Sequence, residues 1–108
     1  MELRGDITIE SEKGFVIDSI PLQISEFTEL IYELAPEGDL FRTYCLQFID
    51  PYGDTTFNML QKRVLVKELQ DLIAKSQNPA QTKYLTNISE FIRAYEDSVH
   101  VYVKFHGD

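Results

Sequence analysis

The residues best suited to metal or nucleophile chemistry are one cysteine and two histidines, and their spacing keeps them apart. His100 and His106 lie six positions apart, so on one strand face they would be separated by roughly 20 Å at about 3.3 Å per residue. The chain holds no Cys-x-x-Cys, His-x-x-x-His or calcium-loop spacing that would gather ligands around one ion. We therefore expect no metal site and no cofactor.

The single thiol, Cys45, lies in an apolar run, and free cysteine is among the most buried residue types. A reactive thiol needs a basic or helix-start environment, whereas the only nearby base is Arg42. The 18 acidic residues allow so many carboxylate pairs that none stands out as an acid/base site. No glycine-rich loop leads into a helix, so no phosphate-binding site is indicated. We expect a binding protein and not an enzyme.

Acidic residues are concentrated in the first half of the chain. Residues 1–54 carry 12 acids and 3 bases, a net charge of −9, whereas residues 55–108 carry 6 acids and 7 bases, a net charge of +1. The densest stretch has no Lys or Arg and holds Glu26, Glu29, Glu33, Glu37 and Asp39. Such a concentration of carboxylates favours binding to a basic protein partner.

A helix that begins after the N-cap Ser25 and ends by Ala35 must position three of these acids. Apolar residues recur with the i, i+3, i+4, i+7 spacing of one buried helix face at Phe27, Leu30, Ile31 and Leu34. A turn of 100° per residue then places Glu26, Glu29 and Glu33 on the outward face, with Tyr32 beside them. An exposed tyrosine beside acids is typical of an anchor for a basic partner. A solvated acidic face that only keeps the protein soluble has the same composition.

The sequence Asp50-Pro51-Tyr52-Gly53-Asp54 is a strong turn and a second candidate contact. Asp50, Tyr52 and Asp54 at its tip could bind the same partner, or they could serve only to build the turn. The predicted partner-binding residues are therefore those of the acidic stretch, Tyr32, and these three.

Hydrophobic periodicity and turn residues predict the first strands. A hairpin is expected over 3–11 and 14–19, with Gly14 supplying the positive φ of its turn. The continuous apolar run 40–49 predicts a strand that is buried on both faces. Residues 55–57 are expected to return as its shorter partner strand.

The second half of the chain predicts two helices and a final strand. A capping box of Asn58 and Gln61 begins a helix that runs to about Ser76, with a charged, solvated outer face. Asn78-Pro79 begins the next helix, so the two form an αα-hairpin. Residues 99–106 alternate as a strand with one buried face. The order ββαββααβ predicts a single α+β domain, residues 1–108, with a mainly antiparallel sheet of about five strands and three helices packed on it.

The net charge of −8 and the isoelectric point of about 4.6 exclude two classes of partner. Nucleic acids and anionic membrane surfaces both favour proteins rich in Lys and Arg. No run approaches the roughly 20 apolar residues needed to span a bilayer, and the first residues lack the basic start and apolar stretch of a secretion signal. We therefore expect a cytoplasmic protein.

Two features carry a resemblance to a known class of small proteins. They are the acidic stretch from Glu26 to Asp39 and the ending Val101-Tyr102-Val103-Lys104-Phe105-His106-Gly107-Asp108. In size, acidity and α+β pattern the chain resembles the immunity proteins encoded beside bacterial toxins. Many of those are cytoplasmic acidic domains that cap a basic nuclease toxin. The resemblance implies that the chain neutralises a basic toxin by occluding its active site, and it carries no site residue over.

Two alternatives stay open at this point. The first is a small-molecule-binding or enzymatic domain with a pocket between sheet and helices, lined by polar residues such as Tyr84, Tyr95 and Arg42. The second is a homo-oligomer, such as a homodimer, that pairs through an edge strand such as residues 99–106.

Overall fold

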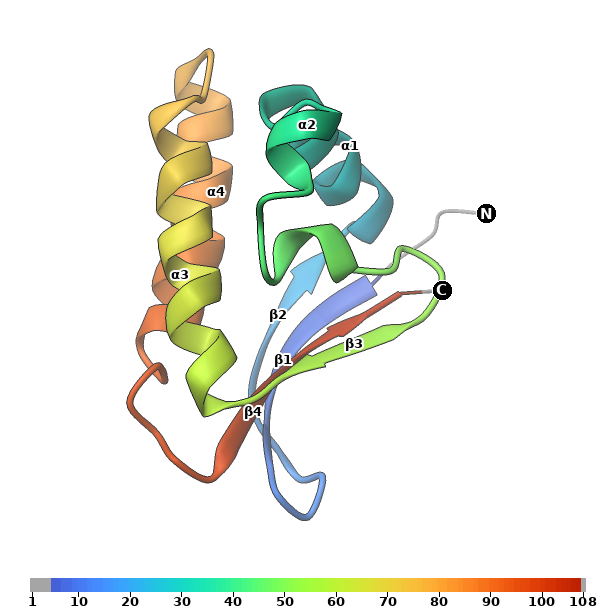
Figure 1. Cartoon of the computed structure of the whole chain (residues 1–108). Helices are drawn as coiled ribbons and strands as arrows, with labels where there is room; N and C mark the ends of the chain where they lie inside the picture. Colours follow the sequence, from blue (N-terminus) through green and yellow to red (C-terminus); the bar gives the residue numbers. More distant parts are fainter. Residues whose placement is uncertain (1–4, 108) are drawn as a thin grey trace.

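The structure, a computed structural model, describes residues 5–107, and within this range it contains four strands and four α-helices (Figure 1). The strands are β1 (Gly5–Ser11), β2 (Val16–Leu22), β3 (Asp54–Phe57) and β4 (Val101–His106). The α-helices are α1 (Ile24–Leu34), α2 (Glu37–Leu40), α3 (Met59–Ala74) and α4 (Pro79–Arg93), with a short 3₁₀ helix, η1, over Leu46–Phe48. The α+β class is confirmed, with one strand fewer and one α-helix more than expected.

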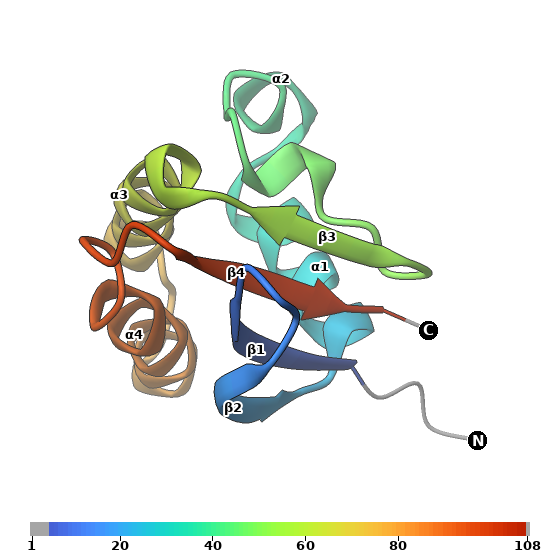
Figure 2. The same ribbon diagram turned by 90° about the horizontal axis from the view of Figure 1, so that it is seen from below.

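All four strands pair antiparallel in the order β2-β1-β4-β3, which Figure 2 shows from below. The predicted hairpin is confirmed, with a second strand that begins and ends later than expected, and Gly14 in its turn has a φ of +83°. Residues 3 and 4 of the predicted first strand lie outside the described residues. The predicted last strand is confirmed over Val101–His106, whereas residues 99 and 100 form a turn, and β4 lies between β1 and β3. Because both sides of β4 are paired, residues 101–106 offer no free edge for a dimer.

The core lies between one face of the sheet and the helices. Ile7 and Ile9 of β1 lie opposite Phe105 and Val103 of β4, and all four side chains are buried. Phe105 stacks on Phe27 of α1, with ring centroids 5.8 Å apart. Aromatic rings therefore fill space between the sheet and the helices. The small-molecule alternative placed its pocket there.

The prediction of a strand over residues 40–49 is wrong. This segment contains the end of α2, a series of turns and η1. Its backbone N–H groups at Tyr44, Cys45 and Leu46 donate to the carboxylate of Glu68 on α3 instead of to a neighbouring strand. As a result β3 has no partner in this segment, and it pairs with β4.

The predicted αα-hairpin is confirmed, because α3 and α4 lie side by side (Figure 1). The capping box at the start of α3 is present: the Asn58 side chain accepts from the Gln61 N–H, and the Gln61 side chain accepts from the Asn58 N–H. The prediction of a solvated charged face on α3 is wrong at two positions, Lys62 and Glu68, which are both buried.

Lys62 is buried because its ammonium group has backbone acceptors. Its Nζ donates to the carbonyl oxygens of Tyr95 at 2.7 Å and Ser98 at 2.8 Å, in the connection between α4 and β4. Burial lowers the pKa of Lys62, and the nearby Asp97 carboxylate opposes that shift. Among the described residues, no helix has the length and apolar character that a transmembrane helix requires.

Candidate functional site

Three of the predicted site residues surround one recess on the surface. Glu26, Glu29 and Glu33 of α1 line a hollow of about 380 Å³, which we call the acidic hollow. Its other walls come from Leu30 of α1 and from Ala80, Gln81 and Tyr84 in the first turns of α4. The helix that carries the three acids begins at Ile24 with Gln23 as its N-cap, two residues before the expected cap, Ser25. The 3- and 4-residue spacing of the acids therefore gathers them on one side of α1.

The acidic hollow holds negative charge that its surroundings do not neutralise. Within residues 5–107, no Lys, Arg or His forms an ion pair with Glu26, Glu29 or Glu33. The hydroxyl oxygen of Tyr84 is buried there and has no hydrogen-bond partner among these residues. Burial raises the pKa of Tyr84, and the Glu26 carboxylate raises it further. The hollow thus presents three carboxylates, a set that suits a cationic group.

The rest of the predicted acidic stretch does not join the hollow. Tyr32 on α1 is 63% exposed and does not line it. Glu37 begins α2, but its side chain lies outside the part of the chain that the structure describes. Asp39 belongs to a different recess, the groove beside α3.

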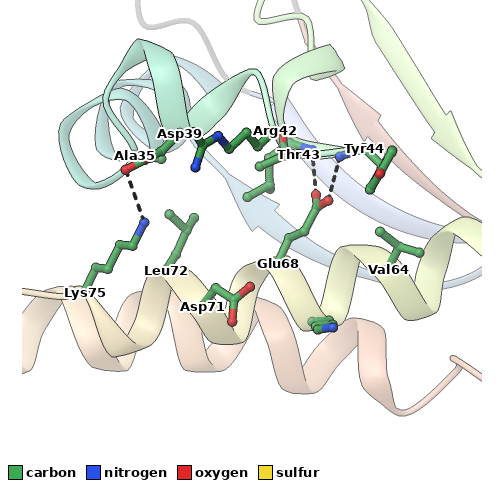
Figure 3. A pocket seen from close by; sticks show the side chains of 12 residues that line it. Ala35, Asp39, Arg42, Thr43, Tyr44, Val64, Glu68, Asp71, Leu72 and Lys75 are labelled. Carbon is green, nitrogen blue, oxygen red and sulfur yellow. Dashed lines mark hydrogen bonds and ion pairs between the residues drawn. The ribbon is translucent and has the colours of Figure 1, made fainter.

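This groove, of about 440 Å³, lies between residues 35–46 and α3 (Figure 3). Apolar side chains contribute much of its lining, namely Ala35, Leu46, Val64 and Leu72. Three acids and three bases also line it: Asp39, Glu68, Asp71, Arg42, Lys67 and Lys75. Unlike the acidic hollow, the groove is balanced in charge.

Glu68 and Lys75 bridge the two walls of the groove (Figure 3). Glu68 is 9% exposed, and its carboxylate accepts backbone N–H bonds from Tyr44 at 2.6 Å and from Cys45 and Leu46 at 3.1 Å. The Lys75 ammonium lies 3.7 Å from the Asp39 carboxylate. Sequence reasoning missed Glu68, because nothing local to α3 indicates a distant segment that needs an acceptor.

The predicted turn is largely occupied with its own structure. The Asp50 carboxylate accepts the Tyr52 N–H at 2.8 Å, and the Gly107 N–H donates to the Gly53 carbonyl at 2.9 Å. A Cβ on residue 107 would overlap the backbone of this turn, which explains the glycine there. Asp54 lies 3.5 Å from the Lys104 ammonium. Of the three predicted residues, only Tyr52 has an exposed side chain that the turn does not use, at 73%.

Aromatic side chains are exposed along residues 41–52, which we call the aromatic segment. Phe41 and Phe48 are each 63% exposed, Tyr44 is 78% exposed and Tyr52 is 73% exposed. Sequence reasoning interpreted the first three as the core of a buried strand. The buried residues are instead Leu40, Cys45, Leu46 and Ile49, whose spacing fits turns and a 3₁₀ helix and not a strand.

Cys45 is buried, and burial together with the Glu68 charge raises the pKa of its thiol to about 11. A thiol held protonated is a poor nucleophile. The expectation of a buried cysteine is confirmed, although it lies just before η1 and not on a strand.

The sheet face opposite the core carries a polar cluster that sequence reasoning did not identify. The Nε2 atom of His106 lies 2.8 Å from the Thr8 hydroxyl and 3.2 Å from the Glu10 carboxylate, and its Nδ1 atom lies 3.8 Å from Asp54. The Thr8 hydroxyl donates to Glu10, so its proton is not available for transfer to His106. His100 pairs separately with Glu12. No group of three or more potential ligands within residues 5–107 could hold a metal ion.

Comparison with protein-family models, with curated proteins and with solved structures found no significant match to this chain.

Proposed function

We propose that this chain is a non-catalytic binding protein whose acidic hollow receives Lys or Arg side chains of a basic protein partner. The observation that carries the proposal is the arrangement of Glu26, Glu29 and Glu33 around one recess, without a neutralising base among residues 5–107. A long cationic side chain fits, because Leu30, Ala80 and the Tyr84 ring can contact its methylene groups. The carboxylates then receive its charged end.

The most concrete form of this function is an inhibitor that neutralises a basic toxin, such as a nuclease, by covering its active site. Nucleases use Lys and Arg to bind phosphates, and a carboxylate surface competes for the same side chains. Complementary charge would speed association and make it sensitive to salt. The resemblance in size, acidity and α+β class to immunity proteins supports this form.

The cation-binding step can be tested with a defined probe, Nα-acetyl-arginine amide, titrated into the labelled protein at constant ionic strength. We expect amide chemical-shift changes confined to residues 26–33 and 80–84, and no such changes with the uncharged analogue Nα-acetyl-glutamine amide. The double variant Glu29→Lys with Glu33→Lys should abolish them. A matched control is Asp6→Lys with Glu90→Lys, which makes the same charge change at two exposed sites away from the hollow. Equal loss of binding in both variants would reduce the effect to net charge and contradict the proposal.

The inhibitor form can be tested with the product of the neighbouring gene. If that product is a basic nuclease-like protein, we expect rapid, salt-sensitive association that the Glu29→Lys with Glu33→Lys variant slows by at least about tenfold. The folded state of the variant is checked by circular dichroism. Unchanged association rates for a correctly folded variant would exclude the acidic hollow as the inhibitory surface.

A small-molecule site is the second candidate, and the groove beside α3 is the observation that favours it. Its apolar lining, together with Arg42, Lys67 and Asp71, is a composition that ligand pockets share. Tyr84 and Tyr95 do not contribute to it, because Tyr84 lines the acidic hollow and the Tyr95 hydroxyl donates to Asp18. A screen of small molecules by thermal shift, repeated on Val64→Glu, would show ligands that stabilise only the wild-type chain.

A further inference from the structure

The aromatic segment exposes more apolar surface than the fold requires. Phe41, Tyr44, Phe48 and Tyr52 lie within 12 residues of one another and are each at least 63% exposed. Leu60, 69% exposed, precedes the groove residue Val64 by one turn of α3 and so lies on the same helix face. Exposed apolar side chains that are concentrated in one segment favour a site that another surface covers.

The area of the exposed rings approaches that of a specific interface. A fully buried aromatic side chain covers roughly 150–250 Å², so the four exposed rings offer on the order of 400–700 Å². Two such surfaces in contact would bury on the order of 800–1,400 Å², and specific interfaces begin near about 1,000 Å². Leu60 and the rim of the groove would add to this area.

The charges beside the aromatic segment favour a second copy of the same chain as the occupant. The chain as a whole carries a net charge of −8, so two copies repel each other overall. The groove is an exception, with three acids and three bases. Arg42, Lys67 and Asp71 form no ion pair among the side chains that the structure describes, which leave out that of Glu37, and we infer that they pair across an interface. A twofold axis places a patch against itself, and only a patch of balanced charge pairs acids with bases in that arrangement.

The edge strand β2 is a weaker surface for self-association. Its Ser19 N–H already donates to the Asp18 carboxylate at 2.9 Å, and Pro21 has no N–H. Both features block the backbone hydrogen bonds that a second strand would need, which is how natural sheets protect their edges. The aromatic segment has no such protection.

We propose that the aromatic segment, together with the groove beside α3, is the contact surface between two copies of this chain in a symmetric homodimer. The contact surface and the lining of the acidic hollow share no residues, so variants of the two can be made separately. The inference is independent of the proposed binding to a basic partner.

The test measures mass by sedimentation velocity and by light scattering during gel filtration, from about 1 µM to about 1 mM, which covers the usual range of weak self-association. We expect the wild-type chain to reach twice its 12.5 kDa mass within this range. Phe41→Glu combined with Tyr44→Glu should weaken dimerisation by at least about 100-fold, since interface aromatic residues are frequent hot spots.

The matched control is Phe15→Glu combined with Ile17→Glu on the β1–β2 hairpin, where the two side chains are 69% and 51% exposed. This control should leave the dimer intact. Circular dichroism checks that both variants fold, and Tyr52→Glu provides a second interface variant should the first unfold. The proposal is overturned if the wild-type chain is monomeric throughout, if the interface variants dimerise as wild type does, or if the hairpin control dissociates the dimer.

Discussion

The acidic hollow and the groove beside α3 are both lined by carboxylates. Two of those in the groove interact with other groups of the protein, whereas those of the hollow neutralise no base among the described residues. In the groove, Glu68 accepts three backbone N–H bonds and Asp39 lies near Lys75. In the hollow, Glu26, Glu29 and Glu33 have no basic partner among residues 5–107. A carboxylate that satisfies buried donors is part of the structure, whereas one that remains unneutralised on a surface is available to a partner. The environment of each acid, and not its position in an acidic stretch, separates the two roles.

The largest expected effect tests the structural side of this comparison. Glu68→Ala leaves three backbone donors without an acceptor, and buried unsatisfied donors cost roughly 1–3 kcal/mol each. Because water can reach part of the groove, we expect a total loss of roughly 3–5 kcal/mol in the free energy of unfolding, measured with urea. Glu33→Ala, in the hollow, is the matched control and should change stability by less than about 0.5 kcal/mol. Similar losses in the two variants would remove the distinction between the regions.

The second largest expected effect is a pH dependence of stability that arises from Cys45, which lies in the segment beside the groove. Folding raises the pKa of Cys45 from 9.0 to about 11, so the folded chain holds the thiol proton more tightly than the unfolded chain. The resulting stability is complete below pH 9 and is lost as the pH rises toward 11, up to roughly 3 kcal/mol. Urea unfolding of wild type and Cys45→Ala across pH 8–11 should therefore show a smaller alkaline loss in the variant. Parallel curves would contradict the assigned role of the buried thiol.

The smallest expected effect concerns Tyr84 in the hollow, and it is a gain in stability instead of a loss. Tyr84→Phe removes a buried hydroxyl that has no partner among the described residues, so it should stabilise the protein by up to about 1 kcal/mol. The control is Tyr95→Phe, because the Tyr95 hydroxyl donates to Asp18 at 2.9 Å and its loss should destabilise slightly. A destabilising Tyr84→Phe would indicate that the hydroxyl already has a partner.

Local sequence signals predicted the helices of the second half and the outer hairpin well. The Asn58 capping box, the Asn78-Pro79 helix start and the Gly14 turn depend on residues within a few positions of one another. The pattern of α1 likewise placed Glu26, Glu29 and Glu33 together, because helical geometry alone determines which residues share a face.

The segment from Leu40 to Ile49 could not be predicted in the same way. Its apolar run is compatible with a buried strand, and the feature that prevents a strand is Glu68, some 20 residues further along the chain. Once that carboxylate takes the backbone donors at positions 44–46, Phe41, Tyr44 and Phe48 are turned outward. Because these donors are taken, the segment does not pair with β3, whose strand partner in the sheet is β4.

The amino-acid sequence by itself determined the acidic character of the first half, the α+β class and the common face of three glutamates on α1. These properties follow from composition and from the periodicity of single elements. The tertiary structure alone decided that α4 completes the acidic hollow, that Glu68 is buried, and that the aromatic segment is exposed. Each of these depends on which distant groups meet, because a hydrogen-bond donor or an apolar ring is satisfied by whatever the fold places beside it.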